Sequence, residues 1–224
     1  MKLRFFLALI FLIGCHSVEN KLNLNIEVEG LKKGTIILKK LNDSLFTEID
    51  SFSVKGDDRI NFTYDLKEPE MLFLDLDLND GSEIKSLNFF AEKAEINIKT
   101  SLDNYGFNID VKGSKNDSLF RDYAYINKKF NDEKLNLFEM SFRNSKLNNK
   151  DSLKIIEDEI ININTRQFLH NANFAVRNSS SEIAPYIAIT DLIESKKILD
   201  TVYKSLSETV RKSKYGVELK ALID

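Results

Sequence analysis

Apolar and polar residues alternate along the first half of the chain with a period of two residues. The alternation begins after Lys21 and ends before Gly113, and turn-forming Gly, Asn and Asp residues separate its runs. Such a pattern places one face of each strand on a core and the other face in water. It predicts about eight strands in an antiparallel β-sandwich or meander over residues 22–113. The apolar positions are Leu22, Leu24, Ile26 and Val28; Ile60, Phe62, Tyr64 and Leu66; Leu72, Leu74, Leu76 and Leu78; Ile96 and Ile98; and Phe107, Ile109 and Val111. Parallel βαβ units are not expected, because no helical segment between these runs is long enough to cross over.

The period changes to that of a helix after Gly113. Apolar residues recur there at steps of three, four and seven, which predicts two long helices joined by a polar turn at residues 143–150. Two consecutive helices with a short connection form an antiparallel hairpin. The two stripes are Leu119, Tyr123, Ile126, Phe130 and Leu137, and Leu153, Ile156, Ile160 and Ile163.

Polar residues mark the expected helix starts. Asn116 or Asp117 is expected to open the first long helix, and Asn149 or Asp151 to cap the second.

Because no flexible linker separates the two halves, the helical region over residues 114–224 is expected to pack on the β domain. The fold class predicted is therefore α+β, with a hairpin and short C-terminal helices after the sheet. The short helices are expected at Ile183-Ala184-Pro185, after Ser195, and from Ser213 or Lys214.

The first fifteen residues have the order of a lipoprotein signal. Lys2 and Arg4 give a positive start, residues 5–13 are apolar, and a Gly then precedes Cys15, the only cysteine in the chain. This order predicts that the signal is removed and that Cys15 becomes the lipidated first residue. The bilayer, contacted through the acylated Cys15, is then the first expected partner.

Two other interpretations of this segment fit less well. The apolar run is too short for a membrane-spanning helix, which needs about 20 residues. An ordinary cleaved signal usually shows an A-x-A-like site, and none follows the run. We therefore expect a signal peptide over residues 1–14, cleavage between Gly14 and Cys15, and a lipidated tether over residues 15–21.

Composition excludes several classes of function. Removal of residues 1–14 leaves 210 of the 224 residues, and because Lys2 and Arg4 leave with them, the formal charge changes from −3 to −5. A mildly acidic chain without basic clusters does not match a nucleic-acid binder. With no cysteine after Cys15 and two histidines in all, a His/Cys zinc site and thiol chemistry are not expected, and no cofactor is predicted.

Several short sequences also resemble a known family. The stretch from Leu24 to Ser114 resembles the domain of unknown function DUF4369, which is found on periplasmic lipoproteins of Bacteroidetes, often ahead of a thioredoxin-like domain of the alkyl hydroperoxide reductase/thiol-specific antioxidant class. The resemblance implies an envelope location, a lipid anchor and the fold. The Cys-x-x-Cys chemistry of the two-domain relatives is not carried over, because no cysteine here corresponds to it. The similar sequences are Val28-Glu29-Gly30-Leu31, Gly34-Thr35-Ile36-Ile37-Leu38, Ile49-Asp50-Ser51, Val54-Lys55-Gly56, Glu68-Pro69-Glu70, Phe89-Phe90-Ala91-Glu92, Glu95-Ile96-Asn97-Ile98 and Val111-Lys112-Gly113-Ser114, and, in the helical half, Ser181-Glu182-Ile183-Ala184-Pro185-Tyr186 and Ser213-Lys214-Tyr215-Gly216.

Other polar and aromatic clusters each have a simpler structural interpretation. Asp75, Asp77 and Asp80 could bind Ca²⁺ or act as acid and base, but alternation already assigns them to the water-facing side of a strand and its turn. The remaining clusters also have simple structural interpretations. We favour core or edge packing, turn or cap formation, or a solvated helix face for them. These are Asp50-Ser51, Phe89-Phe90, His170, Glu157-Asp158-Glu159, and the Asp-Ser-Leu triplets at 43–45, 117–119 and 151–153, which resemble O-glycosylation acceptors.

The leading hypothesis is a non-enzymatic, lipid-anchored envelope protein that serves as a binding or docking module for an unidentified envelope partner. Two rivals remain open: an accessory subunit of a separate thioredoxin-like redox protein, and a surface carbohydrate-binding or adhesion lipoprotein. The residues after Cys15 lack an acidic cluster that would mark surface export, so the periplasmic face of the outer membrane is expected.

Overall fold

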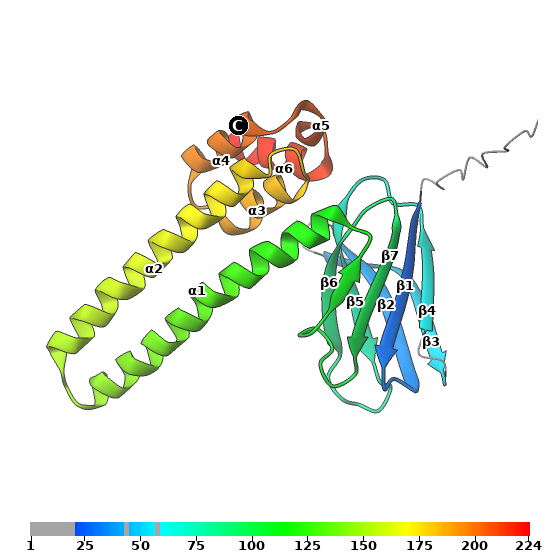
Figure 1. Cartoon of the computed structure of the whole chain (residues 1–224), viewed down its shortest axis with the longest axis horizontal. Coiled ribbons are helices and arrows are strands. Elements are labelled where there is room, and N and C mark those ends of the chain that lie inside the picture. The colour runs from blue at the N-terminus through cyan, green and yellow to red at the C-terminus, as the bar shows by residue number, and fades with distance from the viewer. Residues whose placement is uncertain (1–20, 43–44, 57–58) are drawn as a thin grey trace, which may run out of the picture.

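The computed structural model describes residues 21–42, 45–56 and 59–224, and it confirms the α+β fold (Figure 1). Its strands are β1 (Leu22–Glu29), β2 (Lys33–Asn42), β3 (Leu45–Lys55), β4 (Arg59–Tyr64), β5 (Glu70–Asp77), β6 (Lys85–Ala91), β7 (Glu95–Ser101) and β8 (Asp110–Lys112). They form two four-stranded sheets with the strand orders β4-β1-β7-β8 and β3-β2-β5-β6.

The two sheets share one apolar core, so the arrangement is a sandwich rather than a meander. Leu24 and Ile96 enter this core from the first sheet, and Leu38 and Leu74 enter it from the second, all fully buried. Along β1 every second side chain is buried, which confirms the predicted alternation. The sheet that carries β1 therefore turns its polar side chains toward water.

One strand pair differs from the antiparallel expectation. β1 and β7 run parallel, with Leu24 opposite Ile96 and Ile26 opposite Ile98. Parallel neighbours need a long connection, which is usually a helix. Here the chain passes through β2 and β3 of the other sheet, β4 beside β1, and then β5 and β6 of the other sheet. It returns to β1 with no helix among the described residues of this connection.

The last predicted strand is shorter than its apolar pattern suggests. Phe107 belongs to the turn after β7 and its side chain is 93% exposed, so placing it on a strand was wrong. Gly106 precedes it with a φ of +88°, a conformation that ends extended backbone. Within this last apolar run, the residues that pair with β7 are Asp110–Lys112.

The helical half begins with a two-helix hairpin, as predicted (Figure 1). Its helices are α1 (Lys115–Lys146) and α2 (Lys150–Arg177). Asn149 caps α2 by accepting a hydrogen bond from the Ser152 backbone N–H, in agreement with one of the two predicted caps. The cap of α1 is Ser114, which accepts from the Asp117 N–H at 2.9 Å, so the predicted start at Asn116 or Asp117 was late.

Four shorter helices surround the C-terminal end of α2 (Figure 1). They are α3 (Ile183–Asp191), α4 (Lys196–Ser205), α5 (Glu208–Arg211) and α6 (Lys214–Ile223). Their apolar faces form a second core that also contains Met71 and Phe90 from β5 and β6. The helices therefore pack on the outer face of the second sheet.

Hydrogen bonds and an ion pair fix this junction. Asp117 is fully buried and accepts the Phe90 backbone N–H at 2.8 Å. Arg121 pairs with Asp117 and also donates to the Asn88 carbonyl oxygen. The start of α1 thus satisfies the free edge of β6, where an unpaired strand would otherwise be exposed.

The far part of the hairpin extends beyond this body (Figure 1). Tyr123 is buried near the base, whereas Ile126 and Phe130 are only half-buried. The first apolar stripe is therefore only partly buried, because the rest of the molecule covers only the first turns of α1. We call the distal segment, residues 135–161, the arm end.

Candidate functional site

The lipidation site predicted from the sequence cannot be placed. Cys15, the signal peptide and most of the tether lie outside the described residues, as do Asp43 and Ser44 of the first Asp-Ser-Leu triplet. No helix in the described part of the chain is long and apolar enough to cross a membrane.

The aspartates of β5 and its turn have structural partners. Asp75 forms an ion pair with Lys39 at 2.6 Å, and its side chain is 16% exposed. Asp77 accepts the Asn79 N–H, and Asp80 accepts the Ser82 N–H at 2.9 Å. These last two bonds shape the turn, and hydrogen bonds from Ser82 lower the pKa of Asp80. Within residues 21–42, 45–56 and 59–224, no three His, Cys, Asp or Glu side chains come together as metal ligands.

The two adjacent phenylalanines of β6 point to opposite faces of the sheet. Phe89 enters the sandwich core and Phe90 enters the helical core, both fully buried. The preferred packing interpretation is thus confirmed, and the pair links the two cores. Asp50 and Ser51, by contrast, lie exposed on the edge strand β3, where the Ser51 N–H donates to Asp50 at 2.8 Å.

His170 lies on α2 within an aromatic cluster. Its ring stacks on Tyr123 with a centroid distance of 6.3 Å and contacts Phe130 and Phe174. Burial lowers the pKa of His170, and the positive charge of Arg177 adds to the effect. Both effects favour the neutral imidazole, and the ring serves as a packing group in the cluster.

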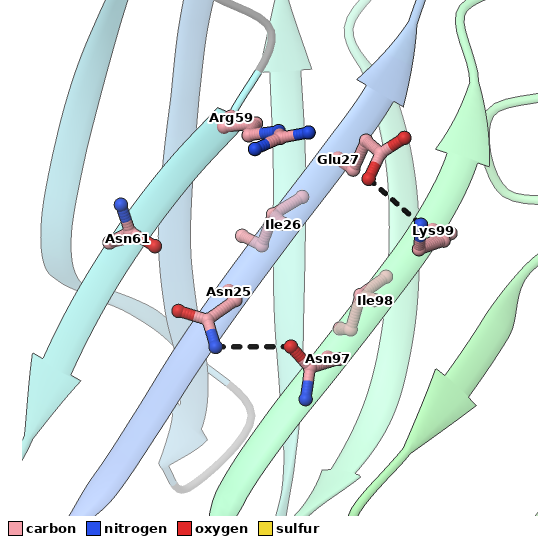
Figure 2. Close-up of a pocket in the computed structure, with 8 residues that line it drawn as sticks. All are labelled: Asn25, Ile26, Glu27, Arg59, Asn61, Asn97, Ile98 and Lys99. Atoms are coloured by element: carbon pink, nitrogen blue, oxygen red, sulfur yellow. Dashed lines mark hydrogen bonds and ion pairs between the residues drawn. The ribbon is translucent and has the colours of Figure 1, made fainter.

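The outer face of the first sheet carries a shallow depression of about 440 Å³ (Figure 2). Asn25 and Asn97 face each other across β1 and β7, with Asn25 Nδ2 donating to Asn97 Oδ1 at 3.1 Å. Beside them Glu27 and Lys99 form an ion pair at 2.9 Å, which lowers the pKa of Glu27; the charge of Arg59 on β4 contributes further. These side chains largely pair with one another, as expected of a solvated sheet face.

A larger groove of about 810 Å³ lies between α1 and α2, near the base of the hairpin. Amide side chains occupy both of its walls. Asn127 and Asn131 lie one turn apart on α1, and three amides follow the helical period along α2. The α2 amides are Asn164, Gln167 and Asn171.

The amides bridge the two helices. Gln167 donates from Nε2 to Asn127 at 2.7 Å and to Asn131 at 3.3 Å, and it accepts from Lys134 at 2.8 Å. At the inner end Tyr123 donates from its hydroxyl to Asp191 at 2.5 Å. Burial, followed by this hydrogen bond, raises the pKa of Tyr123, so its hydroxyl stays protonated.

Sequence reasoning missed this groove. Its amides fall at helical spacing on the inner walls of the hairpin, next to the apolar stripe, where polar residues are ordinarily assigned to the water-facing side. A pattern of Asn and Gln at steps of three and four, running beside the apolar stripe in both helices, would have been the signal.

A third hollow of about 430 Å³ lies at the arm end. Phe138 lines it from α1, and Ile156, Ile160 and Ile161 line it from α2. Glu157 is the single charged residue on its rim among the described residues.

The fold defines the class of protein as a two-sheet β domain with a helical extension. Residues 21–120 match the sequence model of the family Domain of unknown function (DUF4369), so this part of the chain is a DUF4369 domain. The match ends within the second turn of α1, and it confirms the resemblance over the β half. A search of curated proteins finds no match to the chain.

Proposed function

We propose that the protein is a lipid-anchored docking module of the cell envelope, and that the arm end is its contact surface. The observation that supports this proposal is the exposure of large apolar side chains at the arm end. They are Leu135 (59%), Phe138 (54%), Met140 (48%), Phe142 (63%), Leu147 (76%), Ile155 (70%) and Ile161 (56%). Clusters of exposed apolar groups are typical of interaction sites, because water around them is released on binding.

The arm end also suggests the chemistry of its partner. A groove lined by Phe138 and by Ile156, Ile160 and Ile161 accepts an apolar side chain, and Glu157 at its rim favours a cation. Glu157 begins an exposed acidic run that continues through Asp158 and Glu159. The expected partner is therefore a protein with an apolar helix face bordered by Lys or Arg.

The lipid anchor and the cellular compartment are proposed from the sequence. The order of residues 1–15 favours acylation of Cys15, and the DUF4369 domain is compatible with the lipoprotein context that the resemblance implies. We place the protein on the periplasmic face of the outer membrane. A separate thioredoxin-like protein is one partner to test, because the sequence after Cys15 contains no thiol with which this chain could perform that chemistry.

Replacing Cys15 by alanine is expected to abolish lipid incorporation. The resulting protein is expected to be either unanchored or an unprocessed precursor. Metabolic labelling with a radioactive fatty acid, followed by membrane fractionation, measures both effects. The substitution Ser17→Ala, two residues away, is expected to leave labelling unchanged. Equal labelling of the Cys15→Ala protein would contradict the anchor.

A photo-crosslinking amino acid at Ser141, which lines the arm-end groove, is expected to give one discrete protein adduct in intact cells. Glu157→Lys is expected to reduce this adduct at least about tenfold, because it places a cation against the basic border of the partner. Glu159→Lys is the matched control, since Glu159 belongs to the same exposed run but does not line the groove.

The same crosslinker at the exposed Ser145 should give little or no adduct. Adducts of equal yield from both positions, or an adduct at Ser141 that is insensitive to Glu157→Lys, would contradict docking through the arm-end groove. The absence of any adduct at Ser141 would have the same meaning.

A further inference from the structure

The groove between α1 and α2 is lined by amide side chains, which stabilise a helical hairpin less than apolar side chains would. Asn is among the less favourable residues in a helix interior, and two antiparallel helices are normally joined by apolar side chains. Here Asn127, Asn131, Asn164 and Asn171 all line the groove, and a volume of about 810 Å³ lies between them. Small-molecule sites commonly occupy about 300–1,000 Å³, so the groove has the size of a binding site.

A buried polar atom in the groove also lacks a partner. The side chain of Asn171 is part of the groove wall, the residue is 5% exposed, and its Oδ1 accepts no hydrogen bond from any described residue. Burying such an acceptor without a partner is unfavourable, because the hydrogen bond that it makes to water in the unfolded chain is lost. The χ2 torsion of Asn is broad, so a small rotation can turn this oxygen toward a ligand hydroxyl.

The charges and hydrogen-bonding groups define the ligand. Two lysines, Lys128 and Lys134, and two carboxylates, Asp191 and Glu194, line the groove, which leaves no excess of either sign. Each amide both donates and accepts, as a sugar hydroxyl does. Phe120 and Phe168 add apolar area that can cover the C–H face of a ring. An extended peptide is less suitable, because it needs a free sheet edge and separate side-chain pockets.

We propose that this groove between α1 and α2 binds a neutral oligosaccharide. The five amides hydrogen-bond its hydroxyl groups, and the Tyr123–Asp191 pair closes the inner end of the groove. This binding is separate from docking through the arm end, which uses different residues.

The test is isothermal titration of the full chain with neutral hexasaccharides of glucose, mannose, galactose, xylose and N-acetylglucosamine. At least one of them is expected to bind. Asn164→Ala should weaken that binding about tenfold, whereas Asn162→Ala should not change it. Both residues are exposed on α2, but only Asn164 lines the groove, so the two variants carry the same change in composition and helix propensity.

A second matched pair, on α1, is Asn131→Ala and Asn136→Ala, of which only Asn131 lines the groove. Circular dichroism verifies that all four variants are folded. The proposal is overturned if none of the hexasaccharides binds, or if Asn164→Ala and Asn131→Ala bind as tightly as the unmodified chain. Binding of a neutral decapeptide mixture in place of the sugars, with the same sensitivity to Asn164→Ala, would also overturn it.

Discussion

Replacing Phe90 by alanine is expected to lower the free energy of unfolding by about 3–5 kcal/mol, the range typical of a fully buried aromatic residue. The Phe90 side chain is 0% exposed. Its ring meets Tyr186 of α3 at a centroid distance of 5.7 Å and Tyr215 of α6 at 5.9 Å, both in edge-to-face geometry. Because Phe90 belongs to a strand but packs among helices, the change should weaken the attachment of the helical body to the sheet.

Phe89→Ala is the matched control for this prediction. Phe89 is the same residue type, equally buried and adjacent, but it packs inside the sandwich. Urea unfolding followed by near-UV and far-UV circular dichroism should show one transition, which both substitutions shift to lower urea.

Hydrogen exchange then separates the two variants. Phe90→Ala should reduce protection mainly in α3 and α6, and Phe89→Ala mainly in the sandwich strands. Phe90→Ala could instead lower the urea midpoint of a separate helical transition and leave the midpoint of the strands unchanged. That result would show that the two halves unfold independently and that the junction does not couple them.

Alternation predicted β1, β4, β5 and β7 well, because burial on one face of a sheet dictates a period of two along them. The edge strand β3 is mostly exposed and shows no such period. The parallel pairing of β1 with β7 lay beyond this reasoning. Strand neighbours in a sandwich depend on which sheet the chain enters next, and that choice is made by contacts distant in sequence. The local pattern at Leu24 or Ile96 is the same in either orientation.

The start of α1 shows how a tertiary contact overrides a local preference. Asp117 is a good capping residue, and the sequence alone favoured it or Asn116 as the start. In the structure the Asp117 carboxylate instead accepts the Phe90 N–H and pairs with Arg121, and Ser114 caps the helix. A bond to the edge of a strand 27 residues away along the chain cannot be read from the residues around the helix end.

The candidate binding surfaces were the least predictable part. Polar residues in a helix are usually solvated, so Asn164 and Gln167 gave no sign that they face Asn127 across a groove. The arm end was missed for a different reason. Its exposed apolar residues, Phe138 and Ile161 among them, lie outside the two predicted stripes, and the body of the protein does not reach that far along the hairpin.

The second large effect on stability is expected at the junction between the β half and the helical half. Gly113 has a φ of +99°, and a Cβ at this position would lie far inside van der Waals distance of the Glu95 carbonyl oxygen and 3.2 Å from the Ile96 Cα. Both obstacles belong to the backbone of β7, which cannot move without disturbing its pairing with β1 and β8. Gly113 therefore allows β8 to pass close to β7 just before α1 begins.

Gly113→Ala is expected to lower the free energy of unfolding by about 1–3 kcal/mol more than Gly81→Ala. The control, Gly81, has a similar φ of +85° but has no atom within 4 Å of the added Cβ, so it carries only the strain of that conformation, about 1–3 kcal/mol. The Gly113 variant adds a steric overlap, and overpacking commonly costs about 1–3 kcal/mol. Urea unfolding of the two variants measures the difference. Equal midpoints would show that β7 yields to the new side chain, and that the close approach at Gly113 does not position α1 against the sheet.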